Sequence, residues 1–130
     1  MIVDTSAVIA VLRKEPDWKR LFEKIGGTAN SRMSAANFLE TAIVIDSKRD
    51  AVASREFDQF LRDVGVSISP VDEAQVRIAR EAYRDFGKGS GHRAKLNFGD
   101  CFAYALAKAT GEPLLFKGTD FSHTDITAAL

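Results

Sequence analysis

Short apolar runs alternate along this chain with longer stretches in which apolar residues recur at helical spacing. The runs at positions 2–3, 32–33 and 113–116 are too short for helices, and positions 66–71 alternate in polarity as a strand does. Strands that alternate with helices are typical of a parallel sheet covered by helices on both faces. The sequence therefore predicts an α/β fold, with a short parallel sheet in the middle of three α/β/α layers.

Start and stop residues place the helices between these strands. Pro16 fits the first turn of a helix, Ser34 is a favoured N-cap, and Gly111 ends a helical pattern. Asn97 or Gly99 opens the last long helix. The predicted helices cover positions 6–12, 16–25, 34–45, 50–64, 72–86 and 97–109.

Length and composition indicate one domain that spans residues 1–130. A chain of 130 residues with 45% hydrophobic residues can bury a single core, and no linker or repeat divides it. The core is expected to include the apolar stripes of two helices, which are Trp18, Leu21, Phe22 and Ile25 in one and Phe57, Phe60 and Leu61 in the other.

Charge and cysteine content limit the binding partners and the cellular compartment that fit this chain. The 18 basic and 18 acidic residues cancel, so nucleic-acid binding would need a local patch or metal-bridged phosphates. The single cysteine, Cys101, forms no internal disulfide and is expected to be a small buried residue. Because no basic signal region and no long apolar run is present, we expect a soluble cytoplasmic protein without a membrane segment.

Asp4 is the first candidate for a functional site. It lies between the apolar strand and an apolar helix, where a buried carboxylate is costly unless it is paired, hydrogen-bonded or bound to a cation. As an alternative, Asp4 serves only as an N-cap for the amides of Ser6 or Ala7. Three further acids at similar junctions favour a site, and they are Glu40, Asp100 and Asp120.

The predicted topology brings these acids together. Asp4 directly follows the first strand, Asp120 follows the last strand by four residues, and Asp100 lies in the first turn of a helix. Ligands gather outside the carboxyl ends of parallel strands. Glu40 lies about two turns into its helix, and Asn37 precedes it by one turn on the same face.

Clustered carboxylates need a cation, because their mutual repulsion raises their pKa values. Oxygen ligands select hard ions, so Mg²⁺ or Mn²⁺ is expected. The sequence holds no zinc-like set, since Cys101, His92 and His123 are isolated from one another. An ion held by acids, with no phosphate-binding glycine loop of the Walker type, favours metal-assisted hydrolysis of phosphodiesters.

Four motifs together resemble a known family over essentially the whole chain. They are Asp4-Thr5-Ser6-Ala7, Ser34-Ala35-Ala36-Asn37-Phe38-Leu39-Glu40-Thr41, Asn97-Phe98-Gly99-Asp100-Cys101-Phe102-Ala103-Tyr104-Ala105-Leu106-Ala107-Lys108 and Leu114-Leu115-Phe116-Lys117-Gly118-Thr119-Asp120-Phe121. In order, spacing and total length the chain is similar to the PIN-domain ribonucleases, and most similar to the VapC toxins of bacterial toxin–antitoxin pairs. The third motif is the most specific of the four.

This resemblance implies a Mg²⁺-dependent RNA endonuclease that acts as a toxin and inhibits translation. Asp4, Glu40 and Asp100 would form the acid set, with Asp120 as the fourth acid. Asp4 and Asp100 would bind the metal, and Glu40 would orient or deprotonate water. The supporting residues would be Thr5, Ser6, Asn37 and Thr119, and either Asp120 or Thr119 would face the metal.

The resemblance also implies two protein partners. The chain would form a homodimer, and it would bind a small VapB-like antitoxin whose C-terminal segment occupies the active-site groove. An apolar groove between the early helices would seat the antitoxin's tail.

A glycine-rich segment carries the main candidate RNA contacts. Lys88, His92, Arg93 and Lys95 lie between Gly87 and the helix of Asp100, in a loop that is predicted to be mobile. These side chains would clamp RNA phosphates, or would belong to a solvated loop without function. The same two readings apply to Arg13, Lys14 and Lys117.

Two other functions fit parts of the sequence. A receiver-type phospho-acceptor signalling domain has a similar size, uses Mg²⁺, and has a late lysine that Lys117 would match. It needs an acceptor Asp at the end of a central strand, however, and the region of Asp46 and Asp50 reads as helical. A PIN-like domain that binds RNA or a partner without catalysis is the other alternative, which the presence of all four acids disfavours.

Overall fold

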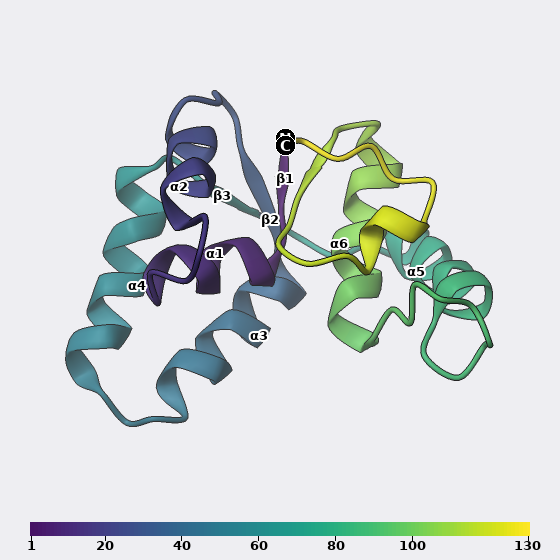
Figure 1. Ribbon diagram of the computed structural model, residues 1–130, viewed down its shortest axis with the longest axis horizontal. Coiled ribbons are helices and arrows are strands. Elements are labelled where there is room, and N and C mark those ends of the chain that lie inside the picture. The colour runs from purple at the N-terminus through teal and green to yellow at the C-terminus, as the bar shows by residue number, and fades with distance from the viewer.

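The computed structural model describes residues 1–130, and its centre is a sheet of four short strands (Figure 1). The strands are β1 (Ile2–Val3), β2 (Arg32–Ser34), β3 (Ser67–Ser69) and β4 (Leu114–Leu115). Their order in the sheet is β3-β2-β1-β4, and every neighbouring pair is parallel. The predicted strands are confirmed, although β3 and β4 are shorter than the sequence suggested. β1 lies in the middle, where its carboxyl end is flanked by β2 and β4.

Six helices connect and cover the strands. They are α1 (Thr5–Leu12), α2 (Trp18–Gly26), α3 (Ala35–Asp46), α4 (Ala51–Asp63), α5 (Glu73–Phe86) and α6 (Phe98–Thr110), and a short 3₁₀ helix η1 spans Phe121–His123. Side-chain N-caps begin five of the helices, because an oxygen at that position accepts a free backbone N–H. These N-caps are Asp4, Ser34, Asp50, Asp72 and Asn97.

The start of α2 differs from the prediction. Pro16 does not lie in the first turn of the helix, because the helix begins at Trp18 with Asp17 as its N-cap. Asp17 has a left-handed backbone conformation with φ 71°, and the amide of Trp18 donates to the carbonyl of Glu15 at 3.0 Å. This turn redirects the chain between α1 and α2, so Pro16 belongs to the connection.

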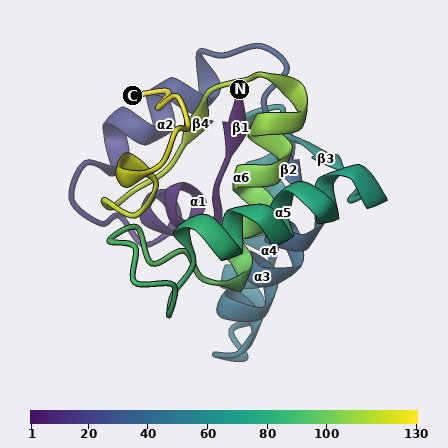
Figure 2. The ribbon, with the colours of Figure 1, turned by 90° about the vertical axis from the view of Figure 1, so that its right-hand side faces the viewer.

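Two apolar clusters lie on opposite faces of the sheet. Ile2 of β1 and Leu114 of β4 pack with residues of α5 and α6. Their neighbours Val3 and Leu115 point to the other face, because side chains alternate along a strand, and they pack with α1 to α4. Figures 1 and 2 show the two groups of helices on either side of the strands. The predicted three-layer α/β/α fold is therefore confirmed.

The contact between α2 and α4 is only partly buried. Leu21, Ile25, Phe57 and Leu61 are core residues, as predicted. Phe22 was expected in the core, but it is 42% exposed. Its ring centroid lies 6.3 Å from that of half-buried Phe60, at the edge of a surface groove between the helices. Helical spacing identifies the face of a helix that points inward, but it does not show how deep each residue on that face lies.

The glycine-rich segment before α6 is anchored rather than free. Ala94 and Leu96 are fully buried, and Leu96 forms a parallel bridge with Gly87. The amide of Leu96 donates to Phe86, and its carbonyl accepts from Lys88, at 2.9 and 2.8 Å. The loop is therefore anchored at its C-terminal end, where two apolar residues fix the chain to the core, and its mobility stays a prediction. None of the six helices combines the length and the apolar character needed to cross a bilayer.

Candidate active site

Asp4 joins the end of β1 to the start of α1. Its side chain is almost completely buried. The amide of Ser6 donates to Asp4 Oδ2 at 2.9 Å, and the Ser6 hydroxyl donates to the same oxygen at 2.6 Å. The N-cap interpretation is therefore correct, but it does not offset the burial. Desolvation raises the pKa of Asp4 to about 6, against the opposing effect of the Ser6 hydrogen bonds, and nearby Glu40 raises it further.

Asp100 lies in the first turn of α6. The amide of Asn97 donates to Asp100 Oδ2 at 2.9 Å, and the amide of Asp100 donates to Asn97 Oδ1 at 2.9 Å, which forms a capping box. Burial raises the pKa of Asp100 to about 7 despite the hydrogen bond from Asn97. The negative charges of Asp4, Asp120 and Glu40 add to this increase. Asp100 is thus within electrostatic range of all three other predicted acids.

Glu40 reaches the site from the second turn of α3. The Thr5 hydroxyl donates to Glu40 Oε1 at 2.5 Å, and Asn37 Nδ2 lies 3.4 Å from the same oxygen. The Asn37 amide also donates to the carbonyl of Gly99 on α6, at 2.9 Å. Thr5 and Asn37, which the sequence placed among the supporting residues of the site, both contact Glu40, and they do so from two different helices.

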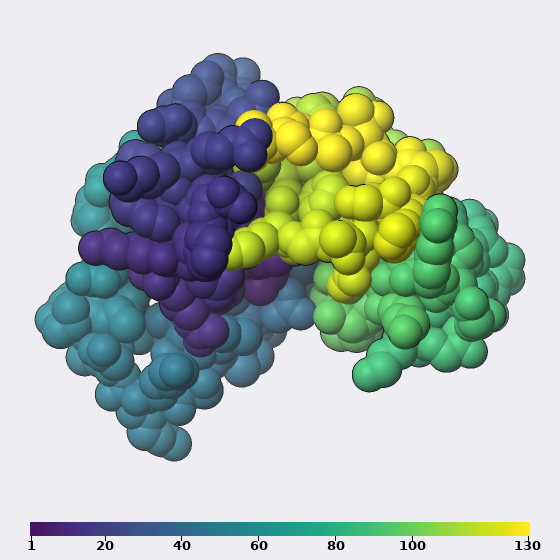
Figure 3. All heavy atoms as spheres, in the orientation of Figure 1, coloured from purple at the N-terminus to yellow at the C-terminus, as the bar shows by residue number.

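These residues line one pocket at the carboxyl edge of the sheet. Its walls come from the first turn of α1, from α3, from the start of α6 and from the segment after β4, and it includes Asp4, Glu40 and Asp100. Figure 3 shows the surface hollowed between the part built by α1 to α4 and the part built by α5 and α6. The prediction that the strand ends gather these acids is consistent with this geometry.

The acids have no basic partner within the chain. None of Asp4, Glu40 and Asp100 takes part in a salt bridge. The only basic residue that lines the pocket is Lys117, whose Nζ lies 3.3 Å from Glu15 Oε2 and donates to the carbonyl of Pro16 at 2.8 Å. Buried carboxylates whose charge is uncompensated favour binding of a cation.

The donor chemistry fits a divalent cation, although the acids do not enclose one by themselves. No group of three His, Cys, Asp or Glu side chains is close enough to form a ligand set. The three acids Asp4, Glu40 and Asp100 offer carboxylate oxygens as ligands, which suit Mg²⁺ or Mn²⁺ rather than zinc. Mg²⁺ in such sites is held by one or two carboxylates and completes its shell with water and substrate phosphates. An open, acidic pocket is compatible with that mode.

Comparison with known proteins assigns the family. The family model described as PIN domain matches residues 1–126. This chain belongs to the PIN-domain family. Over 130 residues this PIN domain is 52% identical to the ribonuclease VapC28 of Mycobacterium tuberculosis, with 100% of the chain and 98% of the relative covered. The predicted resemblance to the VapC group is therefore confirmed.

Solved structures share the fold at low sequence identity. The structure of VapC20 from Mycobacterium tuberculosis, described as a toxin that cleaves the sarcin–ricin loop, has a TM-score of 0.71 and 16% identity, covering 97% of this chain and 95% of that one. A toxin–antitoxin complex from Klebsiella pneumoniae has a TM-score of 0.70 and 15% identity, covering 93% of this chain and 89% of that one.

The family assignment removes the receiver-type alternative. A receiver-type domain would also need an acceptor Asp at the end of a central strand. Asp46 instead ends α3, and Asp50 caps α4.

Asp120 and Thr119 lie outside the pocket wall of this PIN domain. Both are exposed in the segment between β4 and η1, and neither side chain forms a hydrogen bond. Asp120 still acts on the site through its charge, because it contributes to the raised pKa of Asp100. Which of these two residues would face a metal stays a prediction.

The pocket contains two residues that sequence reasoning missed or left undecided. Glu15 lines it from the connection after α1, and no motif or periodicity marked it. Lys117 links three segments, since its amide donates to Ser6 Oγ at 2.9 Å while Ser6 in turn holds Asp4. Lys117 belongs to the fourth sequence motif, shortly after the last strand, but no sequence pattern indicated its contact with Ser6.

The predicted RNA contacts of the glycine-rich segment are not part of the acid pocket. Arg93 and Lys95 are exposed and form no ion pair, and Lys88 is exposed beside an apolar pocket. His92 is engaged in the fold, because its Nδ1 accepts from the amide of Ala94 at 3.1 Å and its ring packs edge-on against Phe86. Arg13 and Lys14 are also exposed. The side chains of Lys88, Arg93 and Lys95 are thus exposed, whereas His92 is held in the fold through its Nδ1 and its ring.

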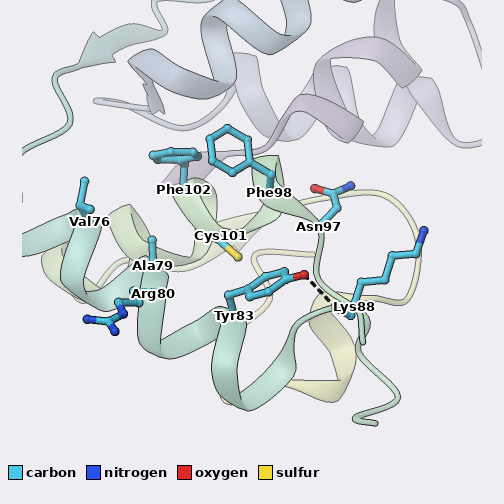
Figure 4. Close-up of a pocket in the computed structure, with 9 residues that line it drawn as sticks. All are labelled: Val76, Ala79, Arg80, Tyr83, Lys88, Asn97, Phe98, Cys101 and Phe102. Atoms are coloured by element: carbon cyan, nitrogen blue, oxygen red, sulfur yellow. Dashed lines mark hydrogen bonds between the residues drawn. The ribbon is translucent and has the colours of Figure 1, made fainter. Parts of the chain in front are cut away.

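An apolar pocket adjoins the acid pocket, and Asn97 lines both (Figure 4). It lies between α5 and α6, with Phe98 and Phe102 in edge-to-face contact at its rim. Cys101 contributes to its wall and is otherwise buried, as predicted. Burial raises the pKa of the Cys101 thiol to about 11, so the thiol stays protonated and unreactive at neutral pH.

Proposed function

We propose that this PIN domain is a Mg²⁺- or Mn²⁺-dependent endoribonuclease, the toxin of a VapBC-type pair, which inhibits translation by hydrolysing RNA. The observation that carries the proposal is the convergence of Asp4 from the end of β1, Glu40 from α3 and Asp100 from α6 into one pocket without a basic partner. The 52% identity to VapC28, a protein named as a ribonuclease, supports the same activity. The toxin would act in the cytoplasm, where its single thiol stays reduced.

Asp4 and Asp100 are the residues that would hold the cation. When bound, the cation would lower the pKa of a water molecule and offset the negative charge of the phosphate. Asp4 is fixed for this role by two bonds from Ser6, and Asp100 by its capping box with Asn97. Asp120 would add negative charge from the rim of the site, with Thr119 as the alternative.

Glu40 would orient the attacking water or accept its proton. Its Oε1 accepts a hydrogen bond from the Thr5 hydroxyl, and no group of the chain donates to its Oε2. A proton acceptor must be held within hydrogen-bond reach of its substrate, and two helices hold this one. The exposed cations Lys88, Arg93 and Lys95 would contact RNA phosphates at a distance from the reacting bond.

RNA cleavage by the purified full chain tests this function. The substrates are total bacterial RNA and a single-stranded RNA pool of random sequence, with Mg²⁺, with Mn²⁺ or with EDTA. We expect cleavage with either ion and none with EDTA, and products free of cyclic phosphate, because water rather than the ribose 2′-hydroxyl attacks. Metal-independent cleavage would contradict the mechanism, and binding without cleavage would indicate the non-catalytic alternative.

A small antitoxin would inhibit the enzyme through the same acids. An Arg or Lys of its C-terminal segment, placed among Asp4, Glu40 and Asp100, would supply the missing positive charge and displace the cation. The likeness to a toxin–antitoxin complex supports such a partner. The groove that includes Phe22 and Phe60, between α2 and α4, offers apolar surface to the rest of the segment.

We further propose that the enzyme is a homodimer. Leu39 and Ile43 lie one turn apart on α3 and are each 58% exposed, and Phe98 at the start of α6 is 79% exposed. Val76 and Tyr83 of α5 are also about half exposed beside the apolar pocket. Large apolar side chains at this density on a monomer surface are typical of an interface.

A further inference from the structure

Gly99 lies against the carboxylate of Glu40. A Cβ atom built on Gly99 would lie 1.8 Å from Glu40 Oε2, 2.5 Å from Cδ and 2.7 Å from Oε1. No side chain can occupy that position while Glu40 stays where it is. A glycine permits such close approach because it has no Cβ.

Gly99 is the only glycine of the chain whose added Cβ would meet a side-chain carboxylate, whereas Gly87 is crowded by Tyr83. Gly65, Gly89, Gly91, Gly111 and Gly118 have positive φ angles and open space around them, so they are required for backbone conformation. Gly99 has no such φ angle and is in a helix, where alanine would ordinarily be preferred. Its glycine is therefore explained by the space that Glu40 occupies.

A buried amide fixes Gly99 and Glu40 relative to each other. Asn37 is fully buried, and its Nδ2 donates to the Gly99 carbonyl at 2.9 Å while it lies 3.4 Å from Glu40 Oε1. Asn37 and Glu40 share α3, whereas Gly99 and Asp100 are consecutive residues of α6. The spacing between the two acids thus depends on this contact between α3 and α6.

Thr41 contacts both Thr5 and Asn37, the two residues that support Glu40. Its hydroxyl is fully buried, donates to the Asn37 carbonyl at 2.8 Å, and lies 3.2 Å from Thr5 Oγ1. Thr5 in turn donates to Glu40. The carboxylate is held by Thr5 on one side and stopped by the backbone of Gly99 on the other, so it has little freedom to move.

We propose that Gly99 is a positioning residue, whose missing side chain forms the seat that holds the Glu40 carboxylate next to Asp100. Its effect on catalysis rests on the proposed ribonuclease function, but the seat itself does not. Filling the seat with one methyl group would push Glu40 away from the water it orients, and leave Asp4 and Asp100 in place.

A thermal melting cycle tests the seat without any substrate. The variants are Gly99→Ala, Glu40→Ala and the double variant, with Gly26→Ala as the matched control, because Gly26 is helical and has open space around it. We expect Gly99→Ala to lower the Tm by about 3 °C or more, and Gly26→Ala to leave it unchanged or raise it. In the Glu40→Ala background, Gly99→Ala should no longer lower the Tm.

Kinetics with an RNA that the wild type cleaves test the positioning. Gly99→Ala should lower kcat about 100-fold and change KM less than about threefold, because a small misplacement of a catalytic group costs about that much. Glu40→Asp, whose shorter side chain clears the added methyl group, should cost less in the Gly99→Ala background than in the wild type.

The outcomes are distinct. If Gly99→Ala lowers the Tm equally in the wild type and in the Glu40→Ala variant, Gly99 does not form a seat for Glu40. If Gly99→Ala leaves kcat unchanged, the seat has no role in positioning Glu40 for catalysis. If Gly99→Ala alone fails to fold, folding of the double variant with Glu40→Ala supports the seat, and its failure to fold overturns it. A wild type that cleaves no RNA would defeat the proposed function, while the melting cycle would still decide the seat.

Discussion

The hydroxyl of Thr5 donates a hydrogen bond to Glu40 Oε1 across 2.5 Å. Thr5 is the first residue of α1 and Glu40 lies in the middle of α3, so this bond joins two helices through residues that are 35 positions apart in sequence. It places Glu40 next to Asp4, which immediately precedes Thr5. This hydroxyl group therefore helps to set the relative position of two candidate catalytic acids.

Thr5→Val should impair catalysis with little effect on binding. Valine keeps the shape of threonine but removes the donor, and a hydrogen bond to a charged group contributes about 1.5–3 kcal/mol. We expect kcat for RNA cleavage to fall about tenfold or more while KM stays similar. Thr110→Val is the control, because it removes a hydroxyl that bonds within the last turn of α6. Equal rates for the wild type and Thr5→Val would contradict the role of this bond.

The metal-free protein should lose stability as the pH rises from about 4 to about 7. The pKa of Asp4 is about 6 and that of Asp100 about 7 in the folded protein, against 3.8 in an unfolded chain. The folded state therefore binds more protons in this range, and the free energy of unfolding falls until both groups are ionised. Well below pH 3.8 both groups are protonated in either state and cause no loss.

Asp4→Asn should remove part of this pH dependence. Asparagine still caps α1 but carries no charge, so the variant should be more stable than the wild type at pH 8 in EDTA, by up to about 3 kcal/mol, and show no gain at pH 4. Denaturant unfolding at both pH values measures the effect, with exposed Asp58→Asn as the control. Mg²⁺ should raise the stability of the wild type at pH 8 more than that of Asp4→Asn. A variant that is less stable at pH 8 would refute the prediction.

The loop before α6 should contribute to RNA affinity rather than to the chemical step. Replacing exposed Lys88, Arg93 and Lys95 by Ala should weaken binding, and reduce the slope of log affinity against log salt by up to roughly 0.7 for each lost phosphate contact. Binding is measured across a salt series in the inactive Asp100→Asn background. The control replaces three exposed cations near or on α4, which are Lys48, Arg55 and Arg62. Similar slopes for both triple variants would show that the loop is only a solvated connection.

The exposed apolar residues of α3 should be required for dimerisation. Ile43→Glu places a charge on the proposed interface, and we expect light scattering to show a dimer for the wild type and a monomer for the variant. Val52 on α4 is 54% exposed, so Val52→Glu is a matched control that should stay dimeric. A wild type that is monomeric at every concentration would contradict the homodimer.

The acid set could be predicted because local sequence fixes where a strand or helix ends. Asp4 follows β1 directly and Asp100 lies in the first turn of α6, and parallel strands bring such ends to one edge. Glu40 followed from its place on α3. By contrast, Glu15 and Lys117 meet only because the connections after α1 and β4 fold back to the same pocket, which no periodicity reports.

The seat of Glu40 shows another limit of sequence reasoning. Gly99 was considered only as a possible helix start, because a glycine in the first turn reads as a local signal. Its relation to Glu40 depends on the packing of α3 against α6, and it appears only when both helices are in place. Phe22 fails for a similar reason, since the depth of an apolar face depends on what covers it.

The most direct measurement is the rate of RNA cleavage in Mg²⁺ by the wild type, Asp4→Asn and Asp100→Asn, each shown to be folded by its melting transition. Each acid variant removes a charge from the proposed metal site, so the account predicts that both lose cleavage, whereas Asp58→Asn retains the wild-type rate. Cleavage by either acid variant at the wild-type rate would contradict the acidic metal site.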